Sequence, residues 1–149
     1  MTKLDDALAG VTRLGFDTAP VIYFVEAHPR YDALVTEVFQ RVADGAFAGV
    51  TSVIALSEVL VHPLRRGDTR LEQEYRDLLL RSDHFATHSI DPAIAARAAQ
   101  LRASYGLRTP DALQVAAALA AGCEAFLTHD AALQRVTELR VLVLDELEL

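Results

Sequence analysis

Cysteine and lysine are almost absent from this chain of 149 residues, which contains one of each. A single cysteine, Cys123, excludes an internal disulfide and any metal site built from several cysteines. Because its neighbours are apolar, we expect Cys123 to be a small core residue. Lysine occurs only at Lys3, so thirteen of the fourteen basic residues are arginines. Arginine suits bidentate contacts to phosphate, but a GC-rich coding sequence would give the same composition.

Long hydrophobic runs are also missing. A membrane-spanning helix needs roughly 18 or more apolar residues, and the longest candidate, Val115 to Cys123, has half that length. The first ten residues, MTKLDDALAG, do not have the basic-then-apolar order of a signal peptide. The chain is therefore expected in the cytoplasm, with no membrane partner. It also lacks a glycine-rich phosphate loop, which disfavours a nucleoside triphosphatase.

The net charge of −7 disfavours a broad basic face for sequence-independent duplex binding. It leaves room for a nucleic acid held through a bound metal ion. Apolar residues make up 52% of the chain, enough for one domain with a complete core. No repeat, low-complexity run or linker divides the sequence, so residues 1–149 are predicted to form a single domain.

Short strand-like runs alternate with longer helical patterns along the chain. This alternation predicts an α/β fold with a mostly parallel sheet covered by helices on both faces. The strand-like runs are Val11–Phe16, Gly49–Val53, Ala86–Ile90, Ala125–Thr128 and Arg140–Leu144. The clearest helical patterns are Ala33–Ala43, Leu71–Arg81, Ala93–Tyr105 and Pro110–Ala121.

Acidic residues follow the predicted strands. Asp17 ends the first strand and Asp130 ends the fourth, while Glu58 lies about two turns into the helix after the second strand. Asp111 begins the helix that leads into the fourth strand. In open parallel sheets the site lies beyond the carboxyl ends of the strands. We therefore expect these carboxylates to meet at one edge of the sheet.

Each carboxylate also has a simpler interpretation. Asp17, Asp111 and Asp130 all lie near helix starts, where aspartate is favoured as a cap and by the helix dipole. Glu58 interrupts an apolar run on a helix that the sequence suggests is buried. A buried carboxylate needs a partner, which could be a metal ion or an ion pair with Arg65 or Arg66.

A cluster of carboxylates with no internal cation favours a hard divalent ion. Mg²⁺ and Mn²⁺ prefer octahedral oxygen ligands and keep several waters. Such an ion can activate water and stabilise the leaving oxygen of a phosphodiester. Mutual repulsion within the cluster is expected to raise the pKa of at least one carboxyl group.

Four motifs together resemble the PIN-domain ribonucleases, and most closely the VapC-like toxins of type II toxin–antitoxin systems. The motifs are Asp17-Thr18, Ser57-Glu58, Thr109-Pro110-Asp111-Ala112 and Leu127-Thr128-His129-Asp130, and the resemblance runs from Phe16 to the C-terminus. It implies a three-layer α/β/α fold with a five-stranded parallel sheet. It also implies cleavage of RNA with Mg²⁺ or Mn²⁺, and a cognate antitoxin protein as partner.

The resemblance assigns roles to matching residues. Asp17, Glu58, Asp111 and Asp130 would form the catalytic, metal-binding acidic site, and Thr128 would support it by orienting an acidic neighbour or a water. The family often has Asn where this chain has His129, which could hold a water, contact phosphate or simply be tolerated. Residues 1–10 form an N-terminal extension relative to the family.

Three arginines near the predicted site are candidates for binding the substrate: Arg65 and Arg66 follow the Glu58 helix, and Arg108 precedes Asp111. A homodimer remains an open expectation. Two other families with acidic strand ends are excluded. A phosphoacceptor receiver domain needs a lysine late in the chain, and a haloacid-dehalogenase-type phosphatase needs Asp-x-Asp where this chain has Asp17-Thr18-Ala19. One alternative stays open, a catalytically inactive PIN-like module that acts through a protein or RNA partner.

Overall fold

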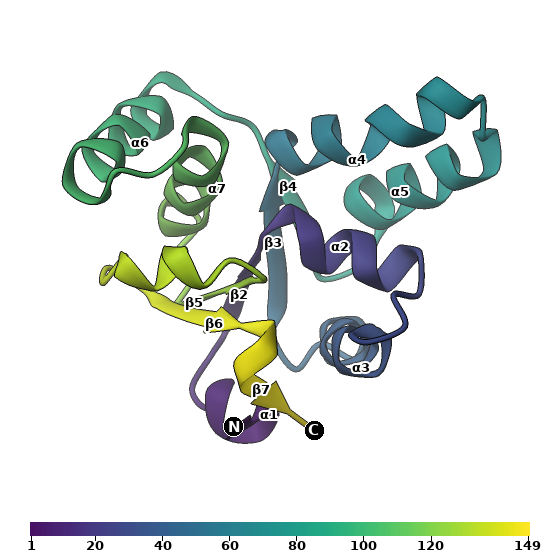
Figure 1. The fold of residues 1–149 in the computed structure, drawn as a ribbon, viewed down its shortest axis with the longest axis horizontal. Coiled ribbons are helices and arrows are strands. Elements are labelled where there is room, and N and C mark those ends of the chain that lie inside the picture. The colour runs from purple at the N-terminus through teal and green to yellow at the C-terminus, as the bar shows by residue number, and fades with distance from the viewer.

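Five parallel strands form the central sheet of the protein, whose computed structural model describes residues 1–149. The spatial order is β4-β3-β2-β5-β6 (Figure 1). The strands are β2 (Arg13–Phe16), β3 (Ala48–Ser52), β4 (Phe85–His88), β5 (Ala125–Thr128) and β6 (Arg140–Val143). All five predicted strands are confirmed to within two residues at their starts and ends.

Helices cover both faces of this sheet, which confirms the predicted three-layer α/β/α architecture. In Figure 1 one pair of helices, α6 (Pro92–Tyr105) and α7 (Thr109–Ala120), lies on one side of the sheet. The other side carries α2 (Thr18–Val25), α3 (Asp32–Ala43), α4 (Val53–Arg66) and α5 (Thr69–Arg81). The four predicted helical patterns correspond to α3, α5, α6 and α7.

Two hydrophobic clusters hold the layers together, one on each face of the sheet. Successive strand residues point to opposite faces, and neighbouring residues in β5 follow this rule. Leu127 packs in the cluster with α2 to α5, whereas Phe126 packs with α6 and α7. Cys123 is buried in the second cluster, as expected for a small core residue.

The first ten residues are an integral part of the domain. The short strand β1 (Thr2–Lys3) pairs in parallel with β7 (Leu147–Glu148), so the two termini lie side by side (Figure 1). The following turn of helix, α1 (Leu4–Ala7), buries Leu4 against the main core. Two 3₁₀ helices, η1 (Ala131–Arg135) and η2 (Leu144–Glu146), complete the C-terminal part. None of the helices has the length and apolar character needed to cross a membrane.

The order of the strands places the acidic residues. Strand β2 lies between β3 and β5, with Gly15 opposite both Val50 and Phe126. Because all three strands are parallel, the segments that follow them emerge at the same edge of the sheet. The helix α7 packs against β2 and β3 and brings its first turn to this edge.

Candidate active site

Asp17 immediately follows β2 and is fixed by hydrogen bonds on both of its carboxylate oxygens. One oxygen accepts from the backbone N–H of Thr18 at 2.9 Å, at the start of α2. The other accepts from the hydroxyl of Thr128 at 2.7 Å, at the end of β5. Asp17 is therefore both the N-cap of α2 and a bridge between two neighbouring strands.

Thr128 orients two acidic residues at once. Its side chain is completely buried. The hydroxyl donates to Asp17 and accepts from the backbone N–H of Asp130 at 3.0 Å. Asp130 is exposed and caps η1, accepting from the N–H of Ala132 at 2.9 Å. Thr128 thus links Asp17 to the backbone of Asp130, and its role in a functional site stays a prediction.

Glu58 lies on α4 and is exposed, so the expectation that it is buried was wrong. Only part of the apolar run around it is buried, including Ala55 and Val59, and Glu58 itself lies outside this buried face of the helix. Neither Arg65 nor Arg66 forms an ion pair with Glu58. Its partner is the hydroxyl of Thr18, which donates to it at 3.2 Å.

A buried chain of polar side chains supports Thr18, and the sequence did not reveal it. The side-chain amide of Gln114 on α7 donates to the Thr18 hydroxyl at 3.0 Å. The amide oxygen of Gln114 in turn accepts from the hydroxyl of Ser52, which caps α4. A signal was present, because Gln114 is the one polar residue in the otherwise apolar stretch from Ala112 to Ala121. This chain connects α2, α4 and α7 directly beneath the acidic residues.

Asp111 pairs with Arg108, which corrects the expectation that no internal cation is present. The Nε atom of Arg108 lies 3.1 Å from a carboxylate oxygen of Asp111, three residues further along the chain. This hydrogen bond and the charge of Asp111 raise the pKa of the guanidinium, and Asp130 and Glu58 raise it further. The Arg108 side chain remains 79% exposed, so it can also reach a bound anion.

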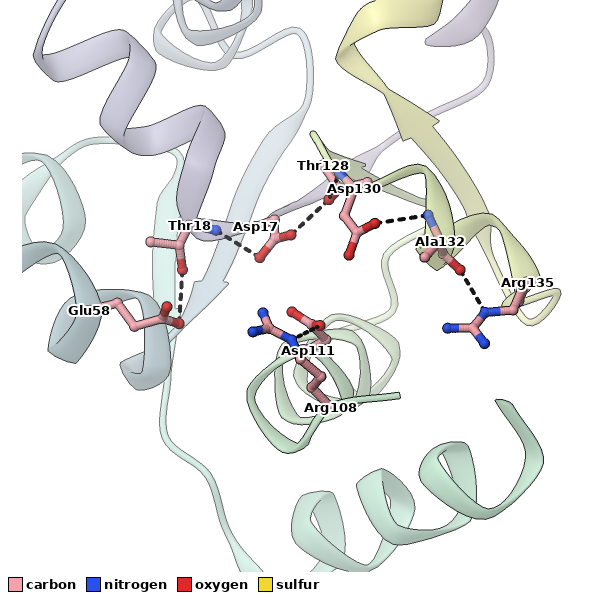
Figure 2. A network of polar contacts seen from close by, with 9 residues as sticks. All are labelled: Asp17, Thr18, Glu58, Arg108, Asp111, Thr128, Asp130, Ala132 and Arg135. Carbon is pink, nitrogen blue, oxygen red and sulfur yellow. Dashed lines mark hydrogen bonds and ion pairs between the residues drawn. The ribbon is translucent and has the colours of Figure 1, made fainter. Parts of the chain in front are cut away.

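All four predicted carboxylates line one cavity of about 500 Å³ at this edge of the sheet. Figure 2 shows them pointing towards a common space, with Arg108 among them. The remaining lining residues are Thr18, Ala19, Ile22 and His129. Arg65 and Arg66 are not part of the lining. They are exposed in the last turn of α4 and form no ion pair.

Burial determines the ionisation of Asp17 within this cavity. Loss of hydration raises the pKa of its carboxyl group above the ordinary value of 3.8. The hydrogen bonds from Thr128 and Thr18 act in the opposite direction, and the charges of Asp111 and Glu58 add to the increase. The expected increase in a carboxyl pKa is present, but its main cause is desolvation, and repulsion contributes less.

Residues 16–139 match the PIN domain family. This chain belongs to the PIN domain family. The PIN assignment agrees with the three-layer fold and covers every carboxylate of the cavity. A search of curated proteins gives no match.

The PIN fold of this chain is also similar to solved structures of toxin–antitoxin complexes. VapBC2 from Rickettsia felis, bound to a DNA fragment from its promoter, aligns with a TM-score of 0.70 and 15% identity, covering 88% of this chain and 98% of that chain. A toxin–antitoxin complex from Klebsiella pneumoniae aligns with a TM-score of 0.68 and 24% identity, covering 89% of this chain and 97% of that chain. DNA-bound VapBC from Salmonella typhimurium aligns with a TM-score of 0.65 and 16% identity, covering 90% of this chain and 98% of that chain. At these identities the likeness concerns the fold.

The donor set of the PIN cavity fits a hard divalent cation held partly through water. Its oxygen donors are four carboxylates, and no thiolate or free imidazole competes with them. Nowhere in the chain do three Asp, Glu, His or Cys side chains converge into a preformed metal site. Mg²⁺ usually binds through one or two carboxylates and keeps several waters. A spread set of carboxylates around a cavity of this size is compatible with that mode of binding.

Proposed function

We propose that this PIN-domain protein is a metal-dependent endoribonuclease that cleaves RNA phosphodiester bonds and acts as the toxin of a toxin–antitoxin module. The observation that carries the proposal is the cavity at the carboxyl edge of the sheet. Four carboxylates from four separate segments of the chain line it. Capping a helix needs only one residue, and gathering like charges around one cavity does not stabilise the fold. The presence of all four carboxylates around this cavity therefore favours a cationic ligand.

Asp17, Glu58, Asp111 and Asp130 are the residues that would hold Mg²⁺ or Mn²⁺. When bound, such an ion supplies an activated water and charge neutralisation for a phosphodiester. Thr128 holds Asp17 and the backbone of Asp130 in fixed positions, so little reorganisation is needed when a ligand enters.

Arg108 contributes a positive charge from the chain itself. Its guanidinium neutralises Asp111 and remains largely exposed. It can therefore contact a phosphate oxygen of the substrate, since guanidinium groups bind phosphate through two parallel hydrogen bonds. This contact would direct an RNA phosphate to the acidic side of the cavity.

The decisive experiment is an RNA cleavage assay with purified protein. Mg²⁺ or Mn²⁺ should support cleavage of RNA, and EDTA should abolish it. Asp17→Asn and Asp130→Asn each replace a charged ligand by a neutral group of the same shape. Each should lower the rate by orders of magnitude while the protein stays folded, as measured by circular dichroism.

The matched control is Asp83→Asn, which removes an exposed carboxylate at the opposite edge of the sheet, just before β4. It should cleave as fast as wild type. Full activity of Asp17→Asn would overturn the assignment of the acidic site.

The toxin role predicts growth arrest when the gene is expressed, with relief by a cognate antitoxin. The Klebsiella pneumoniae protein of similar fold is described as part of a toxin–antitoxin complex. An antitoxin could place a basic side chain in the acidic cavity, where its charge would complement the carboxylates. Glu58→Gln should relieve the arrest, and an arrest as strong as that of wild type would mean that it does not come from this cavity.

One observation favours a second candidate, a PIN-like module without catalysis that binds a protein or RNA partner. Arg108 already neutralises Asp111, and no three ligands converge. This candidate predicts RNA or protein binding with no cleavage under any divalent metal. The cleavage assay with wild type therefore separates the two functions.

A further inference from the structure

His129 lies at the cavity with both ring nitrogens already hydrogen-bonded to protein hydroxyls. Its Nδ1 atom is 2.8 Å from the hydroxyl of Tyr23 on α2, and its Nε2 atom is 2.9 Å from the hydroxyl of Tyr31. A histidine binds phosphate or activates water through a free ring nitrogen. Neither nitrogen of His129 is free for such a role.

The donors and acceptors in this group are consistent with a fixed ring. The Tyr31 hydroxyl donates its only hydrogen to Asp145 at 2.6 Å, so it accepts from the Nε2–H of His129. Nδ1 then accepts from the hydroxyl of Tyr23. Asp145 is itself held by Arg30 at 3.0 Å. The imidazole thus has one defined orientation, set by partners from α2, from the loop before α3 and from η2.

Aromatic packing reinforces this orientation. The rings of Tyr23 and Tyr31 stack with their centroids 5.0 Å apart. Both meet the ring of His129 in an edge-on arrangement, at 5.5 Å and 4.9 Å. Edge-on pairs of this kind are a preferred aromatic geometry.

His129 lines the cavity, and with both nitrogens hydrogen-bonded only its ring carbons are left for contact with a ligand. Its side chain is 36% exposed and lines the cavity together with Ile22 and Ala19 of α2. The lining therefore combines four carboxylates and Arg108 with a smaller apolar and aromatic set, Ala19, Ile22 and His129. His129 adjoins Asp130 in the sequence, so the two sets meet there.

We propose that His129 is a stacking surface for one unpaired base of the RNA, next to the phosphate that binds at the acidic residues. The proposal rests on the proposed function and assigns to one residue of this chain a contact with an unpaired base. A base can lie against an aromatic ring only when it is unstacked from its own helix, which is how proteins commonly read single strands. The apolar side chain of Ile22 would extend this surface.

Two substitutions at His129 separate stacking from a polar role. His129→Phe keeps a flat ring and loses both nitrogens, whereas His129→Asn keeps polar atoms and loses the ring. Binding is measured by fluorescence anisotropy with a labelled single-stranded oligoribonucleotide, in Ca²⁺ in place of Mg²⁺, and the RNA is checked to be intact afterwards. Stacking predicts that the Phe variant binds like wild type. The Asn variant should bind about 5- to 150-fold more weakly, the range that corresponds to losing one base–aromatic contact.

The matched control is His84→Asn, in the segment before β4 at the far edge of the sheet. Asn tolerates the positive φ of 61° that His84 adopts. This variant should bind RNA like wild type. The reverse order at position 129, with Asn binding well and Phe binding poorly, would show a polar contact and overturn the proposal. Equal binding by all variants would overturn it as well.

A series of oligonucleotides tests the same surface without altering the protein. Each carries one abasic nucleotide at a different position around the cleavage site. Wild type should lose affinity at one position, and His129→Asn should not discriminate there, because the base and the ring act as a pair. If wild type binds every abasic RNA equally, the stacking surface is absent, even if an unstable variant makes the substitutions uninformative.

Failure of the stacking proposal and failure of the proposed function give different results. Cleavage in Mg²⁺, with equal binding of all abasic RNAs, would support the ribonuclease proposal and overturn the stacking surface. Position-specific binding without cleavage would overturn the ribonuclease proposal and support the stacking surface. Failure of wild type to bind single-stranded RNA at all would overturn the stacking proposal.

Discussion

The environment of Asp17 acts on its ionisation in two opposite directions. Its burial disfavours the charged form, while Thr128 and Thr18 stabilise that form by hydrogen bonds. The net effect is a pKa above the ordinary value of 3.8, so ionised Asp17 lowers the stability of the metal-free protein at neutral pH. A cation in the cavity would remove this cost.

Asp17→Asn should therefore melt at or above the temperature of the wild type in EDTA at neutral pH. The raised folded-state pKa means that Asp17 contributes stability when protonated, and this contribution is lost as the pH rises through that pKa. Asn never ionises and keeps an oxygen that can accept from Thr18 or Thr128. The advantage of the variant should grow as the pH rises above the ordinary carboxyl pKa of 3.8, as measured by thermal melts followed by circular dichroism.

Asp83→Asn is the control, and the difference between its melting temperature and that of wild type should not grow with pH. A wild type that melts above Asp17→Asn by the same amount at every pH would assign Asp17 to helix capping alone, a contribution of about 1 kcal/mol.

At the scale of elements, Glu124 anchors the sheet at the edge opposite to the cavity. Its carboxylate accepts from the backbone N–H groups of Thr12 and Arg13, at 3.0 and 2.8 Å, just where β2 begins. Its own backbone bonds to Arg13 and Arg140, in β2 and β6. The hydrogen bonds, first that of the Thr12 hydroxyl and then those of the two backbone N–H groups, lower the pKa of Glu124 to about 2. Glu124 thus links the starts of β2 and β6 just before β5 begins, and its side chain binds at the start of β2.

Glu124→Gln should destabilise the protein without changing the cavity. Charge-assisted hydrogen bonds at a partly exposed site are worth about 1 kcal/mol in total, or about 2–4 °C in melting temperature. The lowered pKa means that the ionised group stabilises the fold above its ordinary value of 4.5, and the contribution is lost as the pH falls towards about 2. The difference between wild type and variant should therefore shrink in acid.

Glu74→Gln breaks an exposed ion pair with Arg70 on α5 and serves as the control, with a much smaller expected effect. If both substitutions lower the melting temperature equally, Glu124 has no special role in the sheet.

The helices and strands that the sequence predicted are those whose own residues show a regular hydrophobic pattern. The long helices and the five strands carry hydrophobic repeats and clear end signals, as where Asp91 caps α6. The short pieces β1, β7, η1 and η2 were not predicted, because they depend on contacts with distant segments. Glu58 was placed on the wrong face because apolar residues surround it on both sides, and some of them, such as Leu64, are exposed.

The choice between cap and site could not be made from the sequence for Asp17 and Asp130. In a parallel sheet, the residue that ends a strand and begins a helix occupies both places at once, and both residues do cap a helix. Their proximity depends on β2 and β5 being neighbours in the sheet. The sequence predicted a mostly parallel sheet and left the order of its strands open. Arg108 was overlooked as the ion-pair partner of Asp111, although a spacing of three residues on a helix is a local signal for such a pair.

At the scale of the whole molecule, a metal ion should act as a stabilising ligand. An ion that binds only the folded state adds about 1.4 kcal/mol at ten times its dissociation constant. For a domain of this size that gain corresponds to about 3–5 °C in melting temperature. Wild type and Asp83→Asn should gain equally with Mn²⁺, and Asp17→Asn should gain much less. Equal gains in all three proteins would place the ion outside this cavity.

With a net charge of −7, we expect binding of the proposed RNA substrate to depend on a few arginines. Arg65 and Arg66 are exposed without ion pairs, and Arg108 is largely exposed beside Asp111. Each phosphate contact adds about 0.7 to the slope of log affinity against log salt for single strands, so two or three contacts predict a slope of about 1.4–2.1.

Replacing Arg65 and Arg66 together by Gln should lower that slope by about 1.4 if both bind phosphate. Arg81→Gln, at the end of α5 towards the opposite edge of the sheet, should leave it unchanged. The measurement is RNA affinity by fluorescence anisotropy across a series of salt concentrations. A slope that corresponds to eight or more contacts would require a basic surface that an acidic chain with these exposed arginines does not provide. The acidic cavity, with its cation, would then be a minor part of RNA binding.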